Sequence, residues 1–137
     1  MSNTVSIHQA LVYVMVTMTA VDGRVGDREL HRIGRLAQTL PVFEGFDPER
    51  LTHVTQECGE ILQVEEGLDA VLGLVRQALP DHLAATAYAL AVEVAIADQT
   101  IWQEEIRFLA RLRDTFEIDK LTTAAIERAA MARYQKA

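Results

Sequence analysis

Four acidic residues recur in the sequence as two pairs with the same spacing. Asp22 is followed seven residues later by Glu29, and Asp98 is followed seven residues later by Glu105. Each aspartate ends an apolar stretch, where the partial negative charge of a helix C-terminus repels a carboxylate, so some partner must offset that cost. Four converging carboxylates, with Glu93 as a further oxygen donor, suit calcium or magnesium. The first hypothesis is therefore a divalent-cation site.

A structural role for the same acids is the alternative hypothesis. Glutamates in a first helical turn interact well with the helix dipole and can form a capping arrangement. The acids can also pair with nearby arginines without an ion, and neither loop has the alternating oxygen ligands of an EF-hand. These arginines are Arg24, Arg28, Arg32 and Arg107. Both hypotheses stay open at this point.

An enzyme is the third possibility, namely a small metal-dependent hydrolase that uses Asp22, Glu29, Asp98 and Glu105. The sequence gives it little support, because it has no phosphate-binding glycine loop and no nucleophile elbow. The four histidines are isolated, without the spacing of HExxH, and are expected at the surface or partly buried. They are His8, His31, His53 and His82. A non-catalytic role is therefore favoured.

Trp102 is the candidate residue for binding a protein partner. It falls in the loop before a predicted helix, close to Asp98 in sequence. Tryptophan is enriched among the residues that dominate binding at protein interfaces. The alternative is a ring that folds onto the neighbouring helix.

The candidate residues lie in or between segments whose sequence predicts α-helices. Apolar residues recur in steps of three and four, as in Ile7, Leu11, Val14, Met18 and Val21, and no segment shows the alternation of a half-buried strand. We predict an all-α, compact bundle of about seven helices, the first of them central because it is apolar on most sides. The predicted helices cover about 7–21, 30–40, 47–63, 68–79, 81–97, 106–116 and 119–137.

Three details refine this prediction. Asp47 followed by Pro48 is a strong start signal for the third helix. The sixth helix is expected to carry Ile106 on the same apolar spacing as Leu109 and Leu112. The last helix is rich in small side chains that should let it approach the bundle closely. These are Ala124, Ala125, Ala129, Ala130 and Ala132.

The chain also aligns with itself at a shift of 76 residues. This shift brings Asp22 onto Asp98 and Glu29 onto Glu105, together with the apolar positions of the flanking helices. Apolar matches alone are weak evidence for a repeat, but the matching acids strengthen it. We predict two related helical hairpins, the first and second helices and the fifth and sixth, on either side of a central pair.

The two hairpins carry a family resemblance. Ala20-Val21-Asp22-Gly23-Arg24-Val25 followed by Glu29, and Ala97-Asp98 followed by Ile101 and Glu105, resemble the repeated hairpin signature of TerB-like domains. The resemblance covers nearly the whole chain. It implies a helical module of the bacterial tellurite-resistance and stress-response type, with acidic residues that bind cations and with protein partners.

The length and composition of the chain limit the classes of protein to which it can belong. The 137 residues suit one domain, 1–137, and half of them are apolar. The net charge of −7 comes with scattered basic residues, which argues against nucleic acid as a partner. The single cysteine, Cys58, lies on an apolar helical spacing and is expected in the core. One cysteine cannot form an internal disulfide, so nothing in the sequence points to an oxidising compartment.

The longest strongly apolar stretch runs from Ala10 to Val21 and is shorter than the ~20 residues that a membrane span needs. We therefore expect a buried helix and no membrane insertion. The N-terminus lacks the basic start of a secretory signal, so we expect a cytoplasmic protein. The sequence leaves the oligomeric state open.

Overall fold

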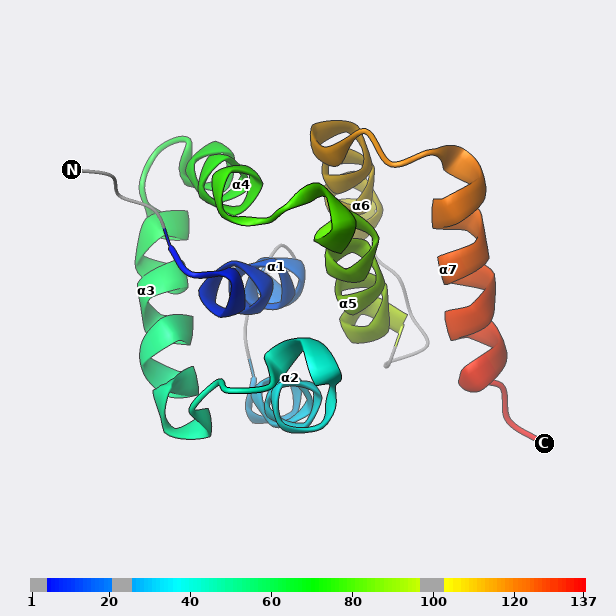
Figure 1. Cartoon of the computed structure of the whole chain (residues 1–137), viewed down its shortest axis with the longest axis horizontal. Helices are drawn as coiled ribbons and strands as arrows, with labels where there is room; N and C mark the ends of the chain where they lie inside the picture. Colours follow the sequence, from blue (N-terminus) through cyan, green and yellow to red (C-terminus); the bar gives the residue numbers. More distant parts are fainter. Residues whose placement is uncertain (1–4, 21–25, 97–102) are drawn as a thin grey trace.

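The computed structural model describes residues 5–20, 26–96 and 103–137, and all regular elements in these ranges are helical. Short 3-10 turns at Pro41–Phe43, Pro48–Arg50 and Asp81–Leu83 lie between some of the helices. Figure 1 shows the helices gathered around α1, with α7 on the outer side of α5. The α-helices are α1 (Ile7–Ala20), α2 (Asp27–Thr39), α3 (Leu51–Gln63), α4 (Gly67–Ala78), α5 (Ala84–Ile96), α6 (Gln103–Phe116) and α7 (Lys120–Arg133). The all-α prediction is confirmed.

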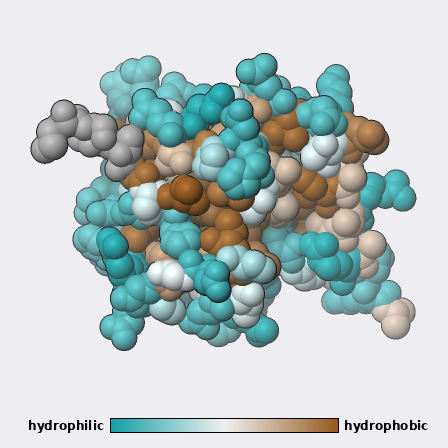
Figure 2. Space-filling view, in the orientation of Figure 1, coloured by the Kyte–Doolittle hydropathy of each residue, from teal (hydrophilic) through white to brown (hydrophobic). Residues whose placement is uncertain are grey.

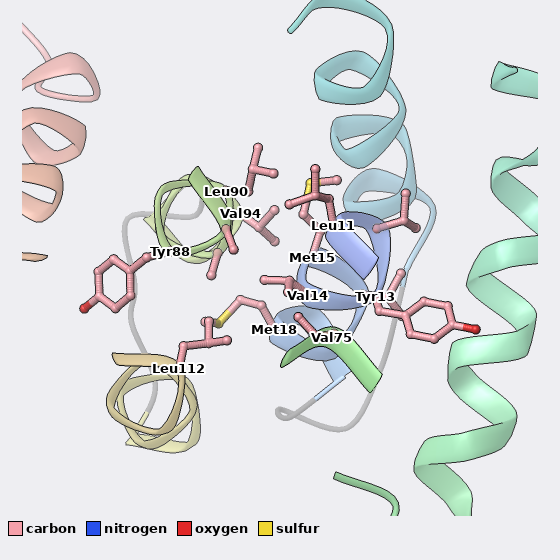
Figure 3. Packing of buried hydrophobic residues seen from close by; sticks show 14 of the residues in the cluster. Leu11, Tyr13, Val14, Met15, Met18, Val75, Tyr88, Leu90, Val94 and Leu112 are labelled. Carbon is pink, nitrogen blue, oxygen red and sulfur yellow. The ribbon is translucent and has the colours of Figure 1, made fainter. Parts of the chain in front are cut away.

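α1 is the centre of the structure. Every residue from 10 to 19 is buried, and the helix packs against α2, α3, α4, α5 and α6. Its apolar residues point to more than one side, so no single neighbour can cover them. Figure 3 shows Tyr13 pointing towards α3 while Met15 and Met18 point to other sides. The prediction of a central first helix is confirmed.

α5 is the second buried helix and lies beside α1. Leu90 and Val94 of α5 face α1, where they pack near Leu11 and Val14 (Figure 3). Burying one such side chain contributes about 1.5–3 kcal/mol relative to leaving it in water. Because α5 is also covered by α6 and α7 on other sides, it connects the core around α1 to the outer helix α7.

Cys58 belongs to this core, as predicted. Its side chain is fully buried on α3, and its sulfur lies 3.6 Å from the hydroxyl oxygen of Thr17 on α1. Burial raises the pKa of the thiol to about 11, which disfavours the reactive thiolate at neutral pH. The residue therefore acts as a small core side chain.

The starts of three helices show why these segments fold locally. The backbone N–H of Gly26 donates to Glu29 at the start of α2, with a distance of 2.9 Å. Asp47 accepts from the N–H of Glu49 at 3.0 Å, and Asp119 accepts from the N–H of Thr122 at 2.8 Å. These contacts satisfy N–H groups that a helix leaves unpaired. The start at Asp47 is confirmed, although the first turn there is a 3-10 turn before α3.

The prediction that the last helix packs against the bundle is confirmed, since α7 packs on α5. Of its alanines only Ala130 is buried, while Ala124, Ala125, Ala129 and Ala132 are exposed. α7 contacts mainly one helix, so it buries only the side that carries Thr123 and Ala130. Small side chains permit a close approach of helices, but a second neighbour is needed to bury a second side.

Ile106 departs from the predicted pattern. Its neighbours Leu109 and Leu112 are buried, whereas 54% of Ile106 is exposed. The residue lies on the side of α6 that faces the space between α5 and α7. An apolar side chain on the helical spacing of a core residue is thus left at the surface.

The surface is otherwise mostly hydrophilic on the face shown in Figure 2, with apolar residues reaching it in small areas. Among the residues that the structure describes, none of the helices is long and apolar enough to cross a bilayer. The expectation of no membrane-spanning helix agrees with this finding.

Gly67, at the start of α4, supports a test of the fold. A Cβ atom there would lie 2.2 Å from the carbonyl oxygen of Ile61, so Gly67→Ala forces the backbone between α3 and α4 to move. We expect it to lower the free energy of unfolding by about 1–3 kcal/mol, as overpacking does.

Gly73 of the same helix is the matched control, because a Cβ there meets nothing within 4 Å. Gly73→Ala should stabilise the protein by roughly 0.5–1 kcal/mol, since alanine has the higher helix propensity. Urea denaturation followed by circular dichroism measures both variants. Equal stability of the two would contradict the close approach at Gly67.

Candidate functional site

Glu29 lies in the first turn of α2, at the third helical position. One carboxylate oxygen, Oε1, accepts the hydrogen bond from the Gly26 N–H. This is the glutamate half of a capping box, and glycine at the N-cap has no side chain to complete the other half. Glu29 therefore caps the start of α2, as the hypothesis of a structural role predicts. Its second carboxylate oxygen, Oε2, takes no part in that hydrogen bond.

Glu105 takes the same place in α6, at its third helical position, and it is buried, with 6% of its surface exposed. A carboxylate in the first turn is stabilised by the positive end of the helix dipole. The repeat, and with it a twofold relation between the two hairpins, stays a prediction, because the loops of both hairpins lie outside the described residues.

Glu93 occupies a different environment from the one predicted. It lies on α5 with an 18% exposed side chain, and its Oε1 accepts a hydrogen bond and ion pair from the Arg133 guanidinium of α7. Its Oε2 accepts from the Tyr134 hydroxyl at 2.6 Å. This hydrogen bond and burial raise the pKa of Tyr134. These three residues, called the Glu93 cluster, give Glu93 a structural role, and its role as a metal ligand stays a prediction.

Sequence reasoning missed the partners of Glu93 because they lie about 40 residues away. Arg133 and Tyr134 stand at the end of a helix that was considered only for its alanines. A tyrosine and an arginine side by side at the end of a helix were the available signal, but nothing in the sequence shows which helix they reach.

Asp22, Asp98 and Trp102 lie outside the described residues, and so does Arg24. Their predicted roles as cation ligands, as partner-binding anchor and as ion-pair partner stay predictions. In the described ranges 5–20, 26–96 and 103–137, no group of three or more His, Cys, Asp or Glu side chains is close enough to hold a metal ion. The predicted cation site includes the two undescribed aspartates, so this finding does not bear on it.

The histidines are placed as the sequence predicted. His31, His53 and His82 are exposed, and His8 is partly buried. The His8 ring contacts the carbonyl oxygen of Val42 at 3.0 Å and packs against Phe43 and Phe46. These contacts give His8 a packing role between α1 and the segment after α2.

A second polar contact between α5 and α7 was also missed. The Tyr88 hydroxyl donates to Oε2 of Glu127, and Figure 3 shows Tyr88 pointing away from α1. Burial raises the pKa of Tyr88, and its hydrogen bond to Glu127 raises it further. Together with the Glu93 cluster, this contact fixes α7 along α5 at two points.

Two concavities are found near these helices. The first, of about 400 Å³, lies between α5, α6 and α7, and the second, of about 350 Å³, is a more open hollow beside α2. Neither is lined by Glu29, Glu93 or Glu105. The two hollows therefore lie apart from the described acids of the predicted cation site.

The Glu93 cluster generates a test of how α7 is held. Glu93→Ala removes the acceptor of both Arg133 and Tyr134, so α7 should open more readily while the core around α1 stays intact. Because Arg133 is half-exposed, we expect a loss of about 1–2 kcal/mol, which corresponds to roughly 5- to 30-fold faster exchange of the α7 amides. Native-state hydrogen exchange measures it.

Asp69→Ala is the control for this test. It removes an exposed ion pair between α4 and α6, with Arg111, and leaves α7 untouched. The α7 amides should exchange as in the unmodified protein. Unchanged protection of α7 in Glu93→Ala would contradict the role of the cluster.

Comparison with known proteins identifies the family to which the chain belongs. No curated protein and no solved structure matches the chain. The family described as "Tellurite resistance protein TerB" matches residues 8–129, a span that includes α1 to α6 and most of α7. The match covers both hairpins and nearly all of the helical domain. The chain is therefore a member of the TerB family of tellurite resistance proteins.

Proposed function

We propose that this protein is a non-catalytic helical module of a tellurite-resistance stress response, and that it acts by binding protein partners and a divalent cation. The observation that carries this proposal is the family match over residues 8–129, which spans the two acidic hairpins.

The cation would be held by Asp22, Glu29, Asp98 and Glu105. Two features support this set. Glu29 and Glu105 both take the third position of a helix, and each helix follows a segment that carries one of the aspartates. Carboxylate oxygens are the ligands that calcium and magnesium prefer. Glu93 is not needed as a ligand, because its carboxylate joins α5 to α7.

The protein partners are expected to present basic surfaces. A net charge of −7 gives the chain an acidic field that attracts such surfaces and repels tellurium oxyanions. Trp102 is the proposed anchor for contact with a partner. We place the module in the cytoplasm, because its one cysteine is a buried core residue that needs no oxidising compartment.

A non-catalytic role is favoured because the sequence has no phosphate-binding glycine loop, no nucleophile elbow and no HExxH spacing among its four histidines.

Calorimetric titration with calcium and magnesium tests the cation site. We expect saturable binding to the unmodified protein and at least a tenfold weaker affinity in Asp22→Asn/Asp98→Asn. Glu29→Gln should also weaken binding, yet it keeps an acceptor for the Gly26 N–H, so the start of α2 is preserved.

Asp81→Asn/Asp114→Asn is the matched control. It removes the same charge from two side chains that are 98% and 75% exposed and lie outside the hairpin loops. Binding should be nearly unchanged. If the unmodified protein shows neither heat nor thermal stabilisation at millimolar ion, the acids act only as helix caps and ion-pair partners.

The stress role is tested in the cell that encodes this chain. Deletion of its gene should reduce growth in potassium tellurite and leave growth without tellurite unchanged. Reintroducing the unmodified gene should restore resistance, whereas Asp22→Asn/Asp98→Asn should restore it less well than Asp81→Asn/Asp114→Asn. Equal growth of the deletion strain in tellurite would overturn the proposed stress.

A further inference from the structure

A groove runs between α6 and α7, with α5 as its floor. Its volume is about 400 Å³, within the range of small-molecule sites. We call it the α5–α7 groove. It is lined by Tyr88, Val92, Ala95, Ile96, Ile106, Leu109, Ala110, Arg113, Glu127 and Met131.

The groove exists because α7 packs on α5 and not closely on α6. Figure 1 shows α7 standing to one side of α5 and α6. Tyr88 and the Glu93 cluster hold α7 in this position through side chains on α5. Two apolar residues at the groove, Ile106 and Met131, are consequently 54% and 41% exposed. This apolar surface is not used by the fold.

The polar residues gather at one end. Tyr88 donates to Glu127, and the charge of Arg113 acts on the Tyr88 hydroxyl, so these three residues lie together. The other end holds Ile96, the last residue of α5, and Ile106 in the second turn of α6. From residue 88 to residue 96 the floor is about 12 Å long, at 1.5 Å per helical residue. The groove is thus polar at one end and apolar along the rest.

The polar end suits an uncharged head group. Glu127 provides an acceptor and a negative charge. Arg113 provides N–H donors and a positive charge, and its Nε also lies 3.5 Å from Oδ1 of Asp114, an exposed residue outside the groove lining. A carboxylate would be attracted by Arg113 and repelled by Glu127, and an amine would meet the opposite pair of forces. A neutral group with both a donor and an acceptor can donate to Glu127 and accept from Arg113.

We propose that the α5–α7 groove binds a small uncharged amphiphile, an alkyl chain with a hydroxyl or primary amide head. The chain would lie over Val92, Leu109 and Ile106, and the head would lie between Glu127 and Arg113. The proposal goes beyond the cation and protein-partner roles and does not depend on either, because neither uses the residues of this groove.

Calorimetry with four probes of one eight-carbon chain tests the head group. 1-Octanol and octanamide should bind at a single site, and octanoate and octylamine at least tenfold more weakly. Nuclear magnetic resonance should show shifts at Val92, Ile106 and Met131 on addition of 1-octanol. Equal affinity for all four probes, or no saturable binding of any, overturns the proposal.

Two variants test the site itself. Ile106→Lys changes an exposed residue of the groove, so it should fold normally and weaken 1-octanol binding at least tenfold. Leu121→Lys, at an 82% exposed position of α7 away from the groove lining, is the control and should bind normally. Binding that survives Ile106→Lys shows that the probe lies elsewhere and overturns the proposal.

Glu127→Gln tests the charge argument. It keeps an acceptor for the Tyr88 hydroxyl and removes the negative charge that repels an anion. Octanoate should then bind at least tenfold better than it binds the unmodified protein, while 1-octanol changes little. If octanoate binds Glu127→Gln as weakly as it binds the unmodified protein, the assignment of the head group to Glu127 and Arg113 is overturned.

Sedimentation velocity separates this site from a contact between two copies of the chain. We expect the same sedimentation coefficient for the unmodified protein and for Ile106→Lys over the concentrations used for binding. A dimer that dissociates in Ile106→Lys would show that a second copy occupies the groove, and it would overturn the amphiphile proposal.

Discussion

The structure depends on a helix without a solvent-facing side. Because α1 buries every residue from 10 to 19, it is stable only when helices surround it, and the arrangement of α2 to α6 follows from that requirement. An isolated helix of this length is marginal in water, so its apolar residues and its neighbours stabilise each other. Of the hairpin acids, Glu29 and Glu105 are placed by the first turns of helices whose positions this core determines.

Much of this could be predicted from the sequence. The apolar spacing located the helices, and the local signal at Asp47 marked a start that the structure bears out. The start of the last helix, predicted at about 119, agrees with Asp119 as the N-cap of α7. Spacing cannot tell whether an apolar position has a neighbour opposite it. Ile106 was therefore expected on the apolar spacing of Leu109 and Leu112, yet 54% of it is exposed. Its exposure depends on where α7 docks, and long-range side-chain contacts decide that.

The candidate site could also be predicted only in part from the sequence. The place of Glu29 in the first turn of α2 follows from sequence-local rules, and its hydrogen bond to Gly26 agrees with them. Glu93 was grouped with Asp98 because the two are close in sequence. The partners of Glu93 in the structure come from the end of α7, about 40 residues away, and its role as a cation ligand stays a prediction.

The family match ends at residue 129, whereas the Glu93 cluster uses Arg133 and Tyr134, which lie beyond it. The side chains that hold the end of α7 are thus outside the span recognisable as common to the family. Substitutions there can tilt or release α7 without disturbing the packing around α1. The shape of the groove is therefore set by contacts between α5 and α7 that are separate from the core around α1.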